Sequence, residues 1–501
     1  MTDIASETGT PAGGWLTLTS ASGRIALFAA VAASAMTQLD ASIVYVALPD
    51  IADDLGVDVT GLQWVLTGYL LTLASLILLG GALGDRYGRR RIFGIGTAWF
   101  MLASALCGLA PNLLILVLAR MLQGVGGALL TPGSLALIQA SFRKDDRAPA
   151  VGLWSGFGGV AGAIGPFLGG WMVDGPGWRW AFLLNVPLGI AVIAAQRTFP
   201  ESRDTHLVPG FDIIGASVVG LGLVGMTWAL NEAGERGWSD PVVLVPLLVG
   251  VAALLAFPFI ELRSPHPLVP PTLFRSRTFS VLNISTFVLY GALGVVFFFV
   301  VYQLQVVAGW SAIQAGSALL PATILMLVGS ASSGRISTRI GPKLQLVVGP
   351  LLVAAGVLLL SRIDADATWW TVLPGGLVFG MGLVTFVAPL TATVMSSADP
   401  DHVNTASGVN NAVARTGSLA AVAAVPLAAG LVAAQSNIEI SDAYRSGMLI
   451  TAILAVIAAL IDLIGLPGNV RPARTSRPVH CALDGAPLQA DPNRCPPVGV
   501  G

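Results

Sequence analysis

The stretch Gly80-Gly81-Ala82-Leu83-Gly84-Asp85-Arg86-Tyr87-Gly88-Arg89-Arg90-Arg91 places five charged residues between two long apolar segments. Its glycines suit a tight turn, because glycine adopts backbone conformations that other residues rarely adopt. Arginine beside an apolar segment is typical of the cytoplasmic loops of membrane proteins. The stretch therefore predicts a short cytoplasmic loop between two transmembrane helices.

The composition extends this reading to the whole chain of 501 residues. Hydrophobic residues make up 54% and charged residues 11%, and the mean hydropathy is +0.79. A soluble globular protein carries about 25% charged residues. The composition excludes a soluble domain with one anchor and predicts a polytopic, all-α integral membrane protein. The net charge of −1 gives no sign of a nucleic-acid partner, and none is expected.

Fourteen apolar windows reach the length of about 17–25 residues that crosses roughly 30 Å of hydrocarbon. They lie near 25–48, 62–84, 92–111, 113–136, 148–173, 180–197, 212–231, 241–260, 279–303, 314–334, 344–361, 371–396, 406–433 and 447–466. An even number of spans places both termini on one side, and 20 of the 26 Lys and Arg residues fall on that side, with 4 on the other. The positive-inside rule therefore predicts a multi-pass protein of the cell (inner) membrane with both termini cytoplasmic.

An internal repeat predicts how the spans are grouped. Gly81-x-Leu83-x-x-Arg86-x-Gly88-x-Arg90 recurs as Gly334-x-Ile336-x-x-Arg339-x-Gly341-x-Lys343. Repeated halves are typical of secondary transporters. The predicted parts are a cytoplasmic segment 1–23, a six-helix bundle 24–198, two inserted helices 199–262, a second six-helix bundle 263–466 and a disordered cytoplasmic tail 467–501.

Few charges lie at membrane depth, where each costs about 2.5 kcal/mol or more. Asp40 and Arg120 both lie about 12 Å below the predicted outer boundary, from the helical rise per residue. We expect them to pair, and we predict that a proton on Asp40 breaks the pair and biases the transport cycle. The alternatives are a static pair, or an Asp40 that bonds the backbone or Gln123. Arg415 is expected either to contact an anionic group or to stabilise a contact between helices.

Two further motifs suit a moving protein. Glycines at helical spacing with a proline form a smooth, kinked stripe in the fifth window, at Gly158, Gly162, Gly165, Pro166 and Gly169. Ordinary tight packing is the alternative to a sliding contact.

The opening loop predicts an inner gate formed by Asp85, Arg86, Gly88, Arg89 and Arg90, with Asp85 bridging to the N-terminus of another helix. A loop that only sets orientation is the alternative. The second copy has Thr338 in place of Asp85, so the gate should depend mainly on the first half.

The substrate cavity is expected between the two halves and largely apolar. The residues predicted to line it are Gln38, Trp64, Tyr69, Phe157, Tyr290, Phe298, Tyr302 and Arg415. All four histidines lie outside the predicted spans, so no metal site is expected.

Five segments together resemble the major facilitator superfamily, and within it the fourteen-span drug:proton antiporters of the multidrug, quaternary-ammonium and tetracycline efflux type. They are the loop Gly81–Arg90, the first-span motif Leu39–Pro49, the fourth-span motif Leu116–Gly126, the antiporter motif Gly162–Gly170, and Trp178–Pro187, which matches W-R-W-x-F-x-x-N-x-P. Ser42 and Tyr45 depart from the Thr and Asn of the first-span motif.

The resemblance implies a proton-coupled exporter of small lipophilic or cationic compounds, with alternating access, no cofactor and no enzymatic activity. It implies proton coupling at Asp40 and Arg120, gating at Asp85, and antiport through the fifth span. The expected partners are a small-molecule substrate, protons and the lipid bilayer, and the expected functional unit is a monomer. A dedicated exporter of one endogenous metabolite and an importer or facilitator on the same fold remain alternatives.

Overall fold

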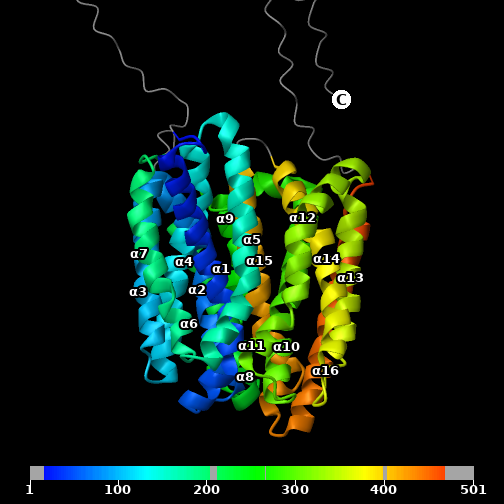
Figure 1. Cartoon of the computed structure of the whole chain (residues 1–501). Coiled ribbons are helices and arrows are strands. Elements are labelled where there is room, and N and C mark those ends of the chain that lie inside the picture. Colours follow the sequence, from blue (N-terminus) through cyan, green and yellow to red (C-terminus); the bar gives the residue numbers. More distant parts are fainter. Residues whose placement is uncertain (1–15, 204–211, 266, 399–402, 469–501) are drawn as a thin grey trace, which may run out of the picture.

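Long helices lying side by side form the whole described part of the molecule (Figure 1). The computed structural model describes residues 16–203, 212–265, 267–398 and 403–468, and these ranges contain no β-strand. Its α-helices are α1 (Ala21–Leu55), α2 (Val59–Tyr87), α3 (Arg89–Gly108), α4 (Leu113–Ser141), α5 (Lys144–Asp174), α6 (Arg179–Leu183), α7 (Asn185–Ala195), α8 (Ile213–Arg236), α9 (Pro241–Arg263), α10 (Arg277–Val306), α11 (Ala312–Ser317), α12 (Leu320–Ile340), α13 (Pro342–Leu360), α14 (Trp369–Ser396), α15 (Val403–Ala428) and α16 (Asn437–Gly465). The predicted tail 467–501 and the N-terminal segment 1–23 lie mostly outside the described residues.

The predicted fold class is confirmed. Within the described ranges, 12 helical segments are long and apolar enough to cross a membrane, with α6 and α7 counted together and α11 joined to the start of α12. Helices α5 and α15 fall outside this set although they have 31 and 26 residues: α5 begins with four charged residues and is rich in glycine, α15 carries several polar residues, and both contain proline. The predicted fourteen crossings are compatible with this arrangement.

Two helix boundaries can be compared with the predicted windows, and one of them differs. The split between α3 and α4 is present, and Asn112 caps α4 by accepting a hydrogen bond from the backbone N–H of Ile115. Helix α1 instead continues to Leu55, past the predicted end at residue 48, because Pro49 is accommodated within the helix and Gly56 ends it with φ +62°. Asp50, Asp53 and Asp54 therefore belong to the last turns of α1 and not to a loop.

The sequence repeat has a counterpart in the backbone. Gly88 ends α2 and precedes α3 with φ +109°, and Gly341 ends α12 and precedes α13 with φ +85°. Residues with a Cβ rarely adopt such angles, so both copies of the motif need glycine at this position.

Helix α8 contacts both α2 and α15. On the α2 side, the Trp64 indole donates to the Glu232 carboxylate at 3.0 Å, and the Asn231 amide donates to the Thr67 hydroxyl at 2.9 Å. On the other side, the apolar side chain of Leu427 near the end of α15 lies close to Gly234, as does Val432 just beyond it. Helix α8, which lies in the predicted insert 199–262, is therefore bonded to α2 and packed against the end of α15.

Side-chain hydrogen bonds join α1–α7 to α10–α16 toward the predicted outer face. The Asp174 carboxylate at the end of α5 accepts from the backbone N–H groups of Ala312 (3.0 Å) and Ile313 (2.9 Å) at the start of α11. The Gln305 amide donates to the Val46 carbonyl at 3.0 Å, and the Gln63 amide donates to the Val422 carbonyl at 3.1 Å. These contacts hold the outer side of the interface closed.

Candidate functional site

A buried acid on α1 is the centre of a polar cluster in the membrane-spanning part. The Arg120 guanidinium on α4 lies 2.5 Å from Asp40 Oδ2, and both side chains are at most 1% exposed. Asp40 Oδ1 accepts from the Gln123 amide at 2.6 Å and from the Asn185 amide at 3.3 Å. We call these four residues the Asp40 network. It ties α1 to α4 and α7.

The Asp40 network is held by a second layer of side chains. The Ser104 hydroxyl on α3 accepts from the Gln123 and Asn185 amides at 3.1 and 3.0 Å and donates to the Phe182 carbonyl at 2.8 Å. The ring centroid of Tyr69 lies 4.3 Å from the guanidinium carbon of Arg120, a distance at which an aromatic face attracts a cation. These contacts fix the orientation of the buried charges.

A close helix contact places Arg120 within reach of α2. A Cβ on Gly124 would collide with the Tyr69 carbonyl and the Thr72 hydroxyl, so only glycine allows α4 to approach α2 this closely. This approach lets Arg120 Nε donate to the Val65 carbonyl at 3.1 Å. The guanidinium is thus bonded to backbone, carboxylate and amide, as a buried charge requires.

The predicted pairing of Asp40 with Arg120 is confirmed, and the Gln123 bond that was its alternative is present as well. The role of Asn185 was missed. The signal in the sequence was an asparagine within an apolar run, at the Asn position of the Trp178–Pro187 motif. In the structure Asn185 is 1% exposed. Its amide completes the set of donors around Asp40.

Arg415 on α15 meets Gln38 on α1. Its Nη2 donates to the Gln38 amide oxygen at 2.8 Å, and both side chains are half-buried. The bond joins the two halves near the centre of the membrane-spanning region. Both predicted uses of Arg415, a helix contact and an anion-binding group, are compatible with this position.

The glycine stripe of α5 packs against two helices. A Cβ on Gly165 would collide with the Ser42 hydroxyl on α1, and a Cβ on Gly169 would lie 3.0 Å from Ile43. On the opposite helix, a Cβ on Gly316 of α11 would collide with the Pro166 carbonyl. Gly162 lies near Gln38, whereas the surroundings of Gly158 fall outside what the structure describes. The stripe therefore lets α5 fit between α1 and α11.

The loop Gly80–Arg91, which we call the arginine loop, makes its described bonds within the first half. Asp85 near the end of α2 pairs with the Arg89 guanidinium at the start of α3, at 2.8 Å, and within the described residues it has no ion pair with a helix beyond α3. Arg90 lies 3.8 Å from the Glu201 carboxylate and donates to the Phe199 carbonyl at 2.9 Å. The Arg86 guanidinium lies 5.8 Å from the centre of the Tyr87 ring. These bonds brace the loop against the end of the sixth span.

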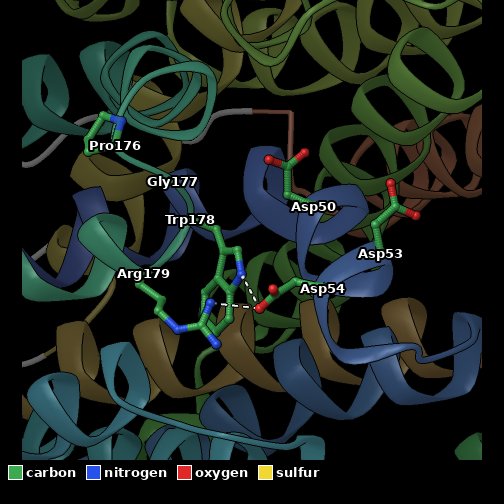
Figure 2. A pocket seen from close by; sticks show the side chains of 7 residues that line it. All are labelled: Asp50, Asp53, Asp54, Pro176, Gly177, Trp178 and Arg179. Atoms are coloured by element: carbon green, nitrogen blue, oxygen red, sulfur yellow. Dashed lines mark hydrogen bonds and ion pairs between the residues drawn. The ribbon is translucent and has the colours of Figure 1, made fainter.

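Two pockets open at the predicted outer face. Figure 2 shows the first, of about 550 Å³, where Asp54 Oδ2 accepts from the Arg179 guanidinium at 2.6 Å and from the Trp178 indole at 3.1 Å. Asp50 and Asp53 line the same pocket and turn away from this ion pair (Figure 2). The second, of about 460 Å³, lies between the halves and is lined by Asp53, Asp174, Tyr302 and neighbours. Neither pocket reaches the Asp40 network.

Among the residues predicted to line the substrate cavity, only Tyr302 lines one of these two pockets. Trp64 faces α8 through its bond to Glu232, and Tyr69 lies against Arg120. Phe298 is fully buried between Phe299 and Tyr302, and Phe157 is 54% exposed. Tyr290 is half-buried and its carbonyl accepts from Ser418 at 2.9 Å. Within the described ranges, no cluster of three or more His, Cys, Asp or Glu residues is placed to hold a metal ion.

Comparison with known proteins places most of the chain in one family. Residues 30–422 match the family described as the Major Facilitator Superfamily. The tetracenomycin C resistance and export protein of Streptomyces glaucescens is 35% identical over 76% of this chain and 71% of its own length. The puromycin resistance protein of Streptomyces alboniger is 36% identical over 78% of this chain and 79% of its own length. The multidrug transporter protein MdtP of Bacillus subtilis is 34% identical over 72% of this chain and 66% of its own length.

Solved structures with little sequence identity show the same fold. A POT family transporter in complex with a thioalcohol-conjugated peptide superimposes with a TM-score of 0.65 at 14% identity, covering 88% of this chain and 95% of its own. A bacterial homolog of the human lysosomal transporter Spinster gives a TM-score of 0.61 at 16% identity, covering 89% of this chain and 97% of its own.

Proposed function

Because the chain belongs to the Major Facilitator Superfamily, and is therefore an integral membrane transporter and not an enzyme, we propose that it exports small lipophilic compounds in exchange for protons. The relatives described above are named for resistance and export, which supports the outward direction of transport. The superfamily needs no cofactor, and we assign the energy source to the proton gradient across the cell membrane. We further propose that the chain acts as a monomer with both termini in the cytoplasm.

The observation that carries the proton-coupling proposal is the Asp40 network. A carboxylate that accepts from a guanidinium and two amides is stabilised in its charged form by each of these bonds. A proton on Asp40 removes the charge attraction to Arg120 and leaves that guanidinium buried without a counter-ion. Since breaking a buried pair costs about 3–5 kcal/mol, protonation of Asp40 would destabilise this conformation enough to change the balance between two conformations.

Helix α1 can transmit this change to the other half. The same helix carries Asp40, accepts the Gln305 bond at Val46 and holds Arg415 through Gln38. A shift of α1 away from α4 and α7 would therefore strain the contacts that close the outer side. This links proton binding to outer opening, as alternating access requires.

The glycine stripe and the arginine loop take complementary roles in the proposal. The close fit of α5 between α1 and α11 seals the outer side, with Asp174 holding the start of α11. At the inner face, Asp85 would leave Arg89 and bridge to a second helix when that side closes. The predicted two-bundle division supplies the moving parts, with the bundles 24–198 and 263–466 rocking against each other.

The proposal is tested by reconstituting the purified protein in vesicles with an internal pH-sensitive dye and a panel of lipophilic dyes and antibiotics. We expect substrate-dependent proton movement with wild type and at least a tenfold loss with Asp40→Asn. The matched control is Asp442→Asn, which removes an acid that is 70% exposed on α16. Wild-type vesicles that move substrate without protons, or an Asp40→Asn variant that keeps proton-driven transport, would contradict the proposal.

A further inference from the structure

One face of α15 is directed at the first half of the molecule. Gly408, Arg415 and Val422 recur at intervals of seven residues, which places them on one side of a helix. All three contact helices of the first half: Gly408 lies near Leu78, Arg415 bonds Gln38, and the Val422 carbonyl accepts from Gln63. Arg415 is therefore held between the halves, where a substrate must pass, and not toward lipid.

The charge of Arg415 is not balanced within this interface. Its hydrogen bond goes to the neutral amide of Gln38, and within the described part of the chain Arg415 makes no ion pair. The acid at similar depth on α1, Asp40, has both oxygens engaged by Arg120, Gln123 and Asn185. A guanidinium carries five N–H donors in a planar fork, and among the described residues only one nitrogen of Arg415 has a hydrogen-bond partner. A charge at membrane depth is costly, so an unbalanced one indicates a functional partner.

Aromatic residues lie on the helices that flank Arg415, α1 and α10. Tyr45 on α1 stacks with Phe297 on α10, with ring centroids 6.2 Å apart and an interplanar angle of 28°. Tyr45 follows Gln38 by seven residues, about two turns of α1, and the Tyr290 carbonyl accepts from Ser418, three residues after Arg415. The region thus combines a fixed cation with flat apolar surfaces from both halves.

We propose that Arg415 binds the acidic group of the substrate, and that this transporter therefore exports lipophilic aromatic anions such as carboxylates and phenolates, in preference to cations. The inference rests on the proposed export function and adds its substrate class. The guanidinium fork matches the two oxygens of a carboxylate. The Gln38 amide holds the fork in place until the substrate displaces it. A cationic substrate would be repelled by Arg415. The substrates expected from the sequence were lipophilic or cationic compounds, and this inference replaces the cationic ones by acidic ones.

A xanthene series with one shared ring system tests the substrate class. The anion is fluorescein, the neutral compound is its dimethyl derivative, and the cation is a rhodamine ester. Equilibrium binding to the purified protein in detergent is measured by fluorescence polarisation without any proton gradient, and uptake into vesicles is measured with one. The variants are Arg415→Gln and Arg415→Lys, and the control is Arg445→Gln, which removes an equal charge that is 56% exposed on α16.

We expect wild type to bind fluorescein more tightly than the rhodamine ester. Arg415→Gln should weaken fluorescein binding by about tenfold to a hundredfold, as loss of a charge-assisted contact does, and leave the neutral compound within about twofold. Arg415→Lys should recover part of the loss, because it keeps the charge without the fork. Preference for the rhodamine ester, unchanged fluorescein binding in Arg415→Gln, or equal losses for the anion and the neutral compound would overturn the inference. Because binding needs no gradient, a failure of proton-driven uptake alone would refute the proposed function and not this assignment.

Discussion

The ion pair between Asp40 and Arg120 makes a quantitative prediction about stability. Asp40→Asn leaves the Arg120 guanidinium buried without its counter-ion, and it replaces one acceptor oxygen by an amide donor among the donors of Gln123 and Asn185. Breaking one partner of a buried pair costs about 3–5 kcal/mol. Arg120→Gln should fall near the lower end of this range, about 3 kcal/mol, because two amides still donate to Asp40.

The double variant separates the pair from the cost of each side chain. With both charges removed, no unpaired ion remains, and the loss should be limited to hydrogen bonds and packing, about 1–3 kcal/mol. The two single losses should therefore exceed the double loss by about 3 kcal/mol or more, which is at the upper end of coupling energies between contacting residues.

The free energy of unfolding of the purified variants can be measured by titration with SDS in mixed micelles, followed by tryptophan fluorescence. All four proteins are compared under one condition, because the double-mutant cycle depends only on differences. If the single losses add to the double loss within about 0.5 kcal/mol, Asp40 and Arg120 do not interact energetically. That result would refute both the stabilising pair and the mechanism that relies on breaking it.

Three further predictions concern the outer contacts and the arginine loop. Asp174→Ala removes the acceptor for two backbone N–H groups of α11, so an impermeant maleimide should label a cysteine introduced at Gln305 about tenfold faster, consistent with a loss of about 1.5 kcal/mol. Gly316→Val should increase the same labelling and reduce transport, because its side chain collides with the backbone of α5, whereas Gly152→Val, which meets no neighbour within 4 Å, should change neither. Glu201→Gln should change the SDS unfolding free energy by less than about 1 kcal/mol, because its ion pair is 37–40% exposed. A loss above about 2 kcal/mol would show that Glu201 anchors the loop more strongly than this exposure implies.

Some contacts of the site were predictable from the sequence because a helix converts residue number into depth. Asp40 and Arg120 lie at the same predicted distance from one boundary on helices of opposite direction, so their pairing followed without knowing the packing. The opening loop was predictable for a similar reason, since its glycines and arginines act locally. Gly88 and Gly341 both have a positive φ because the constraint lies within a few residues of each.

Contacts that depend on which helices are neighbours were not predictable. Asn185 reaches Asp40 only because α7 packs beside α1, and no local pattern specifies that choice. Trp64 was expected in the cavity, yet it bonds Glu232 because α8 lies against α2. The end of α1 was misplaced for a different reason: a proline often ends a helix, but a long helix packed on its neighbours accommodates Pro49.

The two contacts of α8 differ in a way that has a mechanical consequence. Hydrogen bonds such as Trp64 to Glu232 are directional and fail after a displacement of about 1 Å, whereas apolar surfaces such as those of Val432 and Leu427 lose little when they slip past one another. Helix α8 is therefore fixed to α2 by directional bonds but can slide against the end of α15. We expect the two predicted inserted helices, α8 and α9, to move together with the first bundle as one rigid unit. During each transport cycle, α8 would then slide against Val432 and Leu427, and α9 would move against the surrounding lipid.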